Sequence, residues 1–398
     1  MKIVYITRFF WPSKAGSAAA IVTFELARRL VNRGHEVSLF VLDSSDGHTM
    51  AKREPLAIPK GLVVSSTRLS KSRWIWDTLG FVFLGFKGLR AACGTHVIIG
   101  AHHHSHLGSF CAAILSVLAR KPLVIKVHDI LYKPTGVVQW GLYLVMNWLA
   151  CLTFKRADQV LVPGEELVDI VREVYGLRAD KVRKLLNGVD TTRFSPSHRN
   201  NDLRRRIGSK HIVVYSGNIE LAHYGLDALV RATKLVRSSI PDLKVLVIGD
   251  GPDLPRLIQL TNSLCLHDSV RFLGWVSPEL IPTYLASADV GIGPLRPSIG
   301  WIGATPVKVV EYMASGCVVV VGKGCASEEL LTDGVNGIVA ESADVADVAK
   351  SILRAFSDEK LAASLASLAR RTVEELYDWE VIVCDLEDSL RSAAKSVE

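Results

Sequence analysis

The stretch Ser298–Gly316 has the sequence Ser-Ile-Gly-Trp-Ile-Gly-Ala-Thr-Pro-Val-Lys-Val-Val-Glu-Tyr-Met-Ala-Ser-Gly, which predicts a glycine-bearing loop leading into a short helix. Thr305 is a favourable N-cap, and Pro306 suits the first helical position. Gly316 is a common stop signal for a helix. The amino terminus of such a helix presents free N–H groups and the positive end of the helix dipole, so the stretch predicts an anion site.

Two charged residues follow this helix start. Lys308 lies in the first turn, where a cation opposes the helix dipole unless an anion lies between them. Glu311 comes three residues later and shares the face of Lys308. A carboxylate there can accept hydrogen bonds from the two hydroxyls of a ribose. The pair predicts a nucleotide site; an ordinary capped surface helix with a solvated lysine and glutamate is the alternative.

Short apolar, β-branched runs alternate with helical patterns on both sides of this stretch. Helical segments such as Ser17–Asn32 and His106–Ala119 separate the runs. The predicted strands are Lys2–Ile6, Glu36–Leu42, Leu62–Ser66, Val97–Ile99, Leu123–Val127, Gln159–Val162, Ile212–Ser216, Leu243–Ile248, Val270–Leu273, Val290–Ile292 and Cys317–Val321. This alternation predicts an α/β fold with parallel sheets covered by helices on both faces.

Turn signals concentrate in Asn187–Asn201, which predicts the domain boundary. We expect an N-terminal Rossmann-like domain over residues 1–190 and a second over residues 191–376, both doubly wound, with ligands bound at the carboxyl ends of the strands in a cleft. Residues 377–398 contain an amphipathic helix, about Trp379–Lys395, expected to pack back toward the N-terminal domain.

Composition limits the class of protein. The chain has 398 residues, a net charge of +7 and a hydrophobic content of 49%, which suits a folded two-domain protein with an anionic partner. Seven scattered cysteines without a Cys-x-x-Cys pair argue against a disulfide framework and fit a reducing compartment. Because Met1–Ile6 has the pattern of a buried strand and not of a secretion signal, we expect a cytoplasmic protein.

Thr305–Gly316 resembles the donor-site helix of glycosyltransferase family 4, and other segments match that family in the expected order. These are Phe10–Gly16, Arg33–Val37, Leu186–Pro196, Val247–Pro252, Arg271–Val276 and Thr332–Ile338. The resemblance covers nearly the whole chain. It implies a GT-B fold, a nucleotide diphosphate sugar as donor substrate, no cofactor, no required metal, and transfer with retention of anomeric configuration.

The resemblance also implies the site residues. His128, at the carboxyl end of the strand Leu123–Val127, would contact the donor sugar and the reacting centre, and with Lys308 and Glu311 forms the predicted catalytic set; a core histidine is the alternative. Gly16 would let the N-terminal loop approach the phosphates. The residues predicted to bind the donor are Gly16, Gly217, Asn218, Gly249, Gly251, Trp275, Val276, Thr305, Lys308 and Glu311.

Three positions depart from the family pattern. Asn218 and Tyr224 stand where the family has basic residues that hold the diphosphate, and Gly303 stands where it often has a glutamate. Two further functions therefore stay open: a non-catalytic glycosyltransferase-like partner subunit, and a GT-B nucleotide-sugar epimerase. Whether the lost positive charges abolish catalysis is not decided by the sequence.

Two other features bear on partners. The cluster His102–His106 lacks carboxylates and cysteines at ligand spacing, so no metal site is expected there. Arg68–Trp76, Leu79–Phe86 and Val137–Phe154 combine aromatic and apolar residues with basic flanks, which predicts peripheral contact with an anionic membrane; packing of these helices in the core or between the domains is the alternative. The acceptor is then expected to be a saccharide or a lipid-linked molecule, and nucleic acid is not expected.

Overall fold

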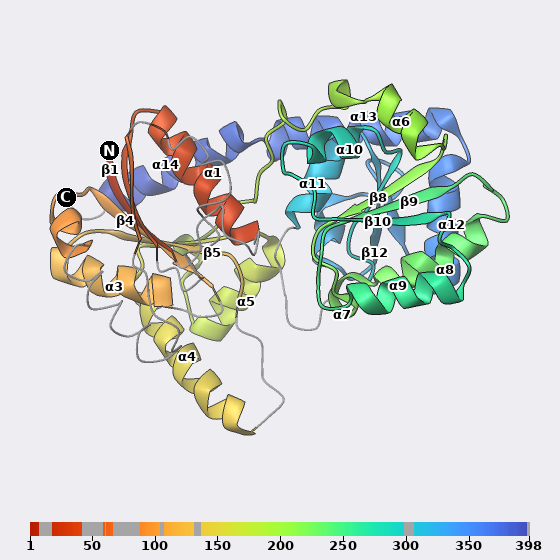
Figure 1. Cartoon of the computed structure of the whole chain (residues 1–398). Coiled ribbons are helices and arrows are strands. Elements are labelled where there is room, and N and C mark those ends of the chain that lie inside the picture. The colour runs from red at the N-terminus through yellow and green to blue at the C-terminus, as the bar shows by residue number, and fades with distance from the viewer. Residues whose placement is uncertain are drawn as a thin grey trace. The chain divides into compact units, whose positions relative to one another are not determined.

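The computed structural model describes residues 1–7, 18–41, 59, 61–66, 88–103, 107–130, 137–297 and 306–395. Contacts divide them into two compact units (Figure 1). Unit 1 contains Met1–Asn187 together with the C-terminal segment that begins at Trp379, and unit 2 contains the described residues from Gly188 to Asp378. The boundaries predicted from the sequence, at residues 190 and 376, lie beside these divisions.

Unit 1 is built on a seven-stranded parallel sheet with the order β3-β2-β1-β4-β5-β6-β7. Its strands are β1 (Lys2–Thr7), β2 (Glu36–Val41), β3 (Leu62–Ser66), β4 (Val97–His102), β5 (Leu123–Val127), β6 (Gln159–Val162) and β7 (Val182–Lys184). Its helices are α1 (Ala18–Asn32), α3 (Leu107–Ala119), α4 (Val137–Arg156), α5 (Glu165–Tyr175) and α14 (Trp379–Lys395), with a 3₁₀ turn at Ala179–Lys181.

The last helix, α14, belongs to unit 1 although it follows unit 2 in the chain. It packs against α1, β4 and β5. A buried ion-pair network holds it there, because Glu387 accepts from His35 at 2.6 Å and lies 3.1 Å from the Arg33 guanidinium. These contacts keep the pKa of the Glu387 carboxyl below its ordinary value despite burial, since Arg33 and His35 both favour the ionised form.

Unit 2 has a six-stranded parallel sheet with the order β10-β9-β8-β11-β12-β13. Its strands are β8 (Ile212–Ser216), β9 (Lys244–Ile248), β10 (Val270–Gly274), β11 (Val290–Ile292), β12 (Val318–Gly322) and β13 (Ile338–Ala340). Its helices are α6 (Asn201–Ile207), α7 (Leu221–Tyr224), α8 (Leu226–Val236), α9 (Leu254–Ser263), α10 (Ile281–Ala286), α11 (Val307–Ala314), α12 (Val345–Phe356) and α13 (Glu359–Leu376), with 3₁₀ turns at Pro196–His198 and Ala326–Leu330.

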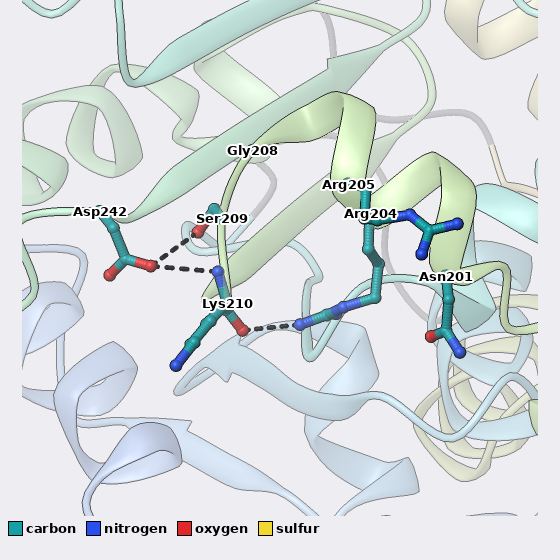
Figure 2. A pocket seen from close by; sticks show the side chains of 7 residues that line it. All are labelled: Asn201, Arg204, Arg205, Gly208, Ser209, Lys210 and Asp242. Carbon is teal, nitrogen blue, oxygen red and sulfur yellow. Dashed lines mark hydrogen bonds between the residues drawn. The ribbon is translucent and has the colours of Figure 1, made fainter.

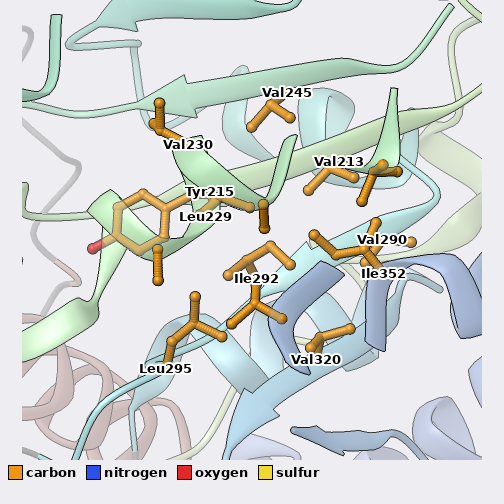
Figure 3. Close-up of a cluster of buried hydrophobic side chains, with 14 of the residues drawn as sticks. Val213, Tyr215, Leu229, Val230, Val245, Val290, Ile292, Leu295, Val320 and Ile352 are labelled. Atoms are coloured by element: carbon orange, nitrogen blue, oxygen red, sulfur yellow. The ribbon is translucent and has the colours of Figure 1, made fainter. Parts of the chain in front are cut away.

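The core of unit 2 lies between this sheet and its helices. Val213 and Val245 meet Leu229 and Ile352 there, and Tyr215 lies at the edge of the same cluster (Figure 3). All five side chains are almost completely removed from solvent. Burial of apolar area on this scale is the main force that stabilises the unit.

The eleven predicted strands are all present, and the largest difference in their bounds is at β4, which continues three residues beyond Ile99 to His102. The sequence misses β7 and β13. Both have three residues and lie at a sheet edge, so they carry too little of the alternating apolar pattern to be recognised.

The predicted start of the helix after the glycine loop is wrong by one residue. Pro306 has extended backbone angles (φ −68°, ψ 114°) and takes the N-cap position of α11 in place of the first helical position predicted for it. The proline ring fixes φ but not ψ, and here ψ leaves the helical region. Gly316 ends the helix as predicted, with φ +81° in the left-handed region.

None of the described helices is both long and apolar enough to cross a lipid bilayer. This includes α4, whose 20 residues make it the helix of greatest length in unit 1. The segments Arg68–Trp76 and Leu79–Phe86, for which the sequence predicts membrane contact, lie outside the described residues.

Candidate functional site

The sheet of unit 2 reverses its strand order at β8. From β8 the chain adds β9 and β10 on one side, then returns to add β11, β12 and β13 on the other. The loops after β8 and β11 leave the same edge of the sheet in opposite directions. Such a switch point is where open α/β sheets bind ligands. The segment that follows β8, Gly217–Tyr224, and the helix α11 both lie in this part of unit 2.

Backbone hydrogen bonds join the carboxyl ends of three strands in this region. Gly217 N–H donates to Ile248 at 2.9 Å, and Gly249 N–H donates to Gly274 at 2.8 Å. A Cβ at Gly249 would come within 2.0 Å of the Gly217 oxygen, and one at Gly251 within 2.3 Å of the Ile219 oxygen. The predicted site glycines Gly217, Gly249 and Gly251 therefore form the packed floor of the site. Close approach of loop to loop requires them, whatever they do for a ligand.

The ammonium group of Lys308 lies over this floor. Its Nζ is 2.8 Å from the Tyr215 hydroxyl and lies 4.3 Å and 3.7 Å from the ring centres of Tyr215 and Tyr224. A Cβ at Gly217 would come within 2.6 Å of the same nitrogen. Burial lowers the pKa of Lys308 to about 7, and the neighbouring Glu311 carboxylate opposes this shift. The residue as a whole keeps some contact with solvent.

Tyrosines join α11 to the end of β8. Tyr312, one residue after Glu311, accepts a hydrogen bond from the Ser216 N–H at 2.7 Å. The Tyr215 hydroxyl donates a hydrogen bond to the Asn218 carbonyl at 2.5 Å. The same hydroxyl oxygen accepts a hydrogen bond from the Lys308 ammonium group. Because these hydroxyls are bonded on both sides, the position of the ammonium group is fixed by the protein before any ligand binds.

Glu311 lies one turn after Lys308 on α11. Burial raises the pKa of its carboxyl to about 7, while Arg193 and then Lys308 favour the ionised form. Arg193 also donates to the Pro278 carbonyl at 2.6 Å, two residues beyond the predicted site residue Val276. Arg193 thus brings the segment after β10 into the neighbourhood of Glu311. Trp275, in the same segment, is 58% exposed.

Of the three positions that depart from the family pattern, the structure describes Asn218 and Tyr224, and their side chains have different surroundings. Asn218 is exposed, and its side-chain amide donates to Glu220 at 3.1 Å. Tyr224 does not take the place of a cation directly; it supplies the ring face that Lys308 contacts. The positive charge of this region is carried by Lys308, and the tyrosine stabilises it.

A pocket of about 430 Å³ lies at the opposite end of the same sheet (Figure 2). It is lined by residues that precede β8 and β9, among them Arg204, Lys210 and Asp242. Their polar groups are bound by the protein: Arg204 contacts the Lys210 carbonyl at 2.6 Å and Asp289 at 2.9 Å, and Asp242 accepts from the Lys210 N–H at 3.0 Å. Since these groups already stabilise the chain, we do not place the functional site here.

In unit 1, His128 follows β5 directly. Its ring stacks on that of His103, with 4.6 Å between ring centres and 6° between ring planes. Its backbone N–H donates to the backbone carbonyl of His102 at 3.0 Å. Burial lowers the pKa of His128 well below its ordinary value, helped by His103 and Lys126, so the ring is neutral near pH 7. Its Nε2 atom is buried without a hydrogen-bond partner among the described residues. Such an atom is available to a ligand.

One buried charged group in unit 1 escaped the sequence analysis. Lys126 is 1% exposed, and its Nζ donates to the Leu185 carbonyl at 2.6 Å. Burial lowers its pKa to about 7. The only signal in the sequence is a lysine within the apolar strand Leu123–Val127, which cannot be told from a lysine at a solvated strand face.

Several predicted residues lie outside the described part of the chain. They are Gly16, Thr305, the loop glycines Gly300 and Gly303, and His104–His106. Within the described ranges, no three His, Cys, Asp or Glu side chains gather where they could hold a metal ion.

Comparisons with known proteins agree with this arrangement. Residues 19–193 match the model of Glycosyltransferase Family 4, and residues 200–372 match the model of Glycosyl transferases group 1. The chain is 28% identical over 200 residues to the GDP-mannose-dependent alpha-(1-6)-phosphatidylinositol monomannoside mannosyltransferase of Mycolicibacterium smegmatis. This match covers 48% of the chain and 51% of that protein, so the chain spans about half the length of this relative.

Other known proteins match this chain over a larger share of its length. Alpha-D-kanosaminyltransferase of Streptomyces kanamyceticus is 26% identical over 310 residues, which cover 74% of the chain and 77% of that protein. The crystal structure of Anabaena HepE in complex with UDP superposes with a TM-score of 0.77 at 22% identity, covering 98% of this chain and all of that one. At this identity the likeness establishes the fold, and it confirms the predicted GT-B class. The two glycosyltransferase models thus match both units in the expected order, and the model matched by residues 19–193 is that of the family which the sequence resembles.

Proposed function

We propose that the protein is a retaining glycosyltransferase that moves a sugar from a nucleotide diphosphate donor to a saccharide or lipid-linked acceptor. The observation that carries the proposal is the position of Lys308: an ammonium group fixed over a glycine floor, in the first turn of α11, with the Glu311 carboxylate one turn away. A phosphate beside Lys308 and a ribose beside Glu311 would satisfy both charges.

The chemistry requires a cation where the diphosphate leaves. When the bond between the anomeric carbon and the diphosphate oxygen breaks, negative charge grows on the phosphates. Lys308 and the N–H groups at the start of α11 would stabilise this charge. A bound diphosphate also raises the pKa of Lys308 from about 7, so binding of the donor favours the charged form that the reaction needs.

The missing basic residues bear on how strongly the donor is held. Each lost charge-assisted contact costs about 1.5–3 kcal/mol of binding energy. The ring faces of Tyr215 and Tyr224 lie within 4.3 Å of the Lys308 ammonium and stabilise it in place. We propose that this single, well-positioned cation does the work that two do elsewhere in the family.

His128 is proposed to contact the donor sugar. Its ring is neutral near pH 7 and its buried Nε2 has no partner among the described residues, so it can exchange one hydrogen bond with a sugar hydroxyl. A neutral imidazole orients the sugar and contributes only a dipole.

The acceptor side of the proposal includes a membrane. The mycobacterial relative is named for a phosphatidylinositol monomannoside, which is a lipid acceptor. Exposed tryptophan and leucine side chains on α4 support peripheral contact with a bilayer. We propose that the protein works at the surface of a membrane in the synthesis of a glycolipid or cell-surface glycan.

A non-catalytic partner subunit is the second candidate. Asn218 favours it, because this exposed side chain binds Glu220 and brings no charge to the site. Such a subunit would bind nucleotide weakly or not at all and would form a stable complex with an active enzyme.

The test is a thermal-shift screen of the full chain with UDP, GDP, ADP and TDP and their common sugars, with and without EDTA. We expect one nucleotide to raise the melting temperature, in a way insensitive to EDTA, because a ligand of the native state alone stabilises it. No shift with any nucleotide would overturn the donor site and favour the partner subunit.

The matched variant is Glu311→Gln. Above about pH 7 the wild-type carboxyl is ionised and accepts from the ribose, so the variant should bind the nucleotide about tenfold more weakly there. Below that pH the wild-type carboxyl is protonated, and the two proteins should approach each other in affinity. An equal affinity across the whole range would exclude Glu311 from the site.

A further inference from the structure

An apolar surface covers two adjoining helices of unit 1. α3 and α4 pack against each other, and both turn large apolar side chains to solvent. We call this the α3–α4 apolar surface; its main residues are Val117, Leu118, Trp140, Leu144, Trp148 and Leu152. Leu118, Leu144 and Trp148 are each about three-fifths exposed, at 61%, 60% and 61%.

The amino-terminal half of α4 is apolar without being buried. Trp140, Leu144, Trp148 and Leu152 recur every fourth residue and so share one face of the helix. Between Trp140 and Leu149 none of the described side chains is buried, whereas Ala150 and Phe154 in the second half enter the core. Figure 1 shows α4 extending away from the sheet of its unit. A row of exposed apolar side chains along one helix face is typical of a binding face.

The charge around this surface has one sign. Neither α3 nor α4 contains an acidic residue. Arg120 and Lys121 follow α3, and Lys155 and Arg156 end α4. The two basic ends lie together, because Arg156 Nη2 donates to the Lys121 carbonyl at 3.2 Å. Asp158, which is 3.5 Å from Arg156, offsets only part of the charge.

We propose that the α3–α4 apolar surface docks the protein on an anionic lipid bilayer. Trp140 and Trp148 would enter the head-group region, where tryptophan is favoured, and the four basic residues would face lipid phosphates. The helix lies in the interface, since no described helix can cross a bilayer. This surface would make the membrane contact of the proposed function, and the docking rests on that function. A second copy of the chain would cover the apolar area, but the basic ends favour an anionic partner, since Asp158 offsets only part of their charge.

The experiment is co-sedimentation of the full chain with vesicles. One set contains phosphatidylcholine alone and the other contains about one third phosphatidylglycerol. The test variant is Leu144→Gln with Trp148→Gln, and the control is Leu235→Gln with Leu376→Gln, two similarly exposed side chains of unit 2. We expect the wild type to bind anionic vesicles, the test variant to lose at least about fivefold in partitioning, and the control to change less than about twofold.

A further variant tests the charge: Arg120→Gln with Lys155→Gln should weaken binding to anionic vesicles and leave binding to neutral ones unchanged. Equal partitioning of test and control variants would overturn the inference, as would a dimer that the test variant converts to monomer without vesicle binding. The nucleotide-dependent thermal shift of the test variant should match the wild type. A protein that docks but binds no nucleotide would overturn the proposed reaction and leave the docking surface intact.

Discussion

Each unit contains a buried lysine whose pKa is lowered to about 7, and the two differ in what surrounds them. Lys126 of unit 1 is 1% exposed, and its Nζ donates a hydrogen bond to the backbone carbonyl of Leu185. Lys308 of unit 2 is half-buried between two tyrosine rings, with a carboxylate one turn away. Lys126 donates to one backbone carbonyl, whereas Lys308 donates to the Tyr215 hydroxyl and also lies against the two ring faces. A shifted pKa alone therefore does not identify a functional lysine.

The largest expected effect concerns stability, at Lys126. Between about pH 7 and its ordinary pKa near 10.5, the unfolded state binds this proton and the folded state does not. The free energy of unfolding should therefore rise with pH across this range, by at most about 1.4 kcal/mol per pH unit. Lys126→Met should remove this contribution. Urea unfolding of both proteins at about pH 7 and pH 9.5 measures it, and parallel pH profiles would show that Lys126 is not the titrating group.

The next effect concerns activity, at Lys308. Lys308→Ala should lower donor turnover at least tenfold, about 1.4 kcal/mol, because the departing diphosphate loses its cation. Lys234→Ala, at an exposed position on α8, is the matched control and should leave the rate unchanged. Lys126→Met should also retain nucleotide affinity. If Lys126→Met abolished transfer while Lys308→Ala did not, the comparison between the two lysines would be reversed.

The smallest expected effect is on donor turnover in variants of Tyr224, which distinguish the role of its ring from that of its hydroxyl. Tyr224→Phe keeps the ring face that lies 3.7 Å from Lys308 and should turn over donor at the wild-type rate. Tyr224→Leu removes a cation–π contact worth about 0.5–1 kcal/mol, so turnover should fall about two- to fivefold. Initial rates with saturating acceptor distinguish the two. A loss of equal size in both variants would assign the role to the hydroxyl.

The sequence was sufficient for the scaffold. Apolar β-branched runs predicted eleven of the described strands, and they failed at β7 and β13, which have three residues each and lie at sheet edges. The switch between extended and helical backbone at Pro306 depends on a single ψ angle, so the residue pattern could not place the helix start more closely than one position.

The candidate site was less accessible to sequence reasoning. Lys308 and Glu311 could be found because their spacing along one helix has a direct meaning. Tyr215 could not, because a tyrosine at the end of an apolar strand has the pattern of a core residue, and its contact with Lys308 joins positions 93 residues apart. Gly217, Gly249 and Gly251 are predicted from the sequence to bind the donor, and in the structure a Cβ at Gly249 or Gly251 would meet the backbone of another loop.

The position of α14 has a consequence for the order in which the protein is completed during its synthesis. Unit 1 emerges first from the ribosome, yet the faces of α1, β4 and β5 that α14 covers stay bare until unit 2 has also been made. His35, which is synthesised early, can therefore pair with the Glu387 carboxylate only after nearly the whole chain has been made. Unit 2 is formed by one stretch of the chain, from Gly188 to Asp378, and can complete its core before α14 is made. Unit 1 is synthesised first but completes its core last.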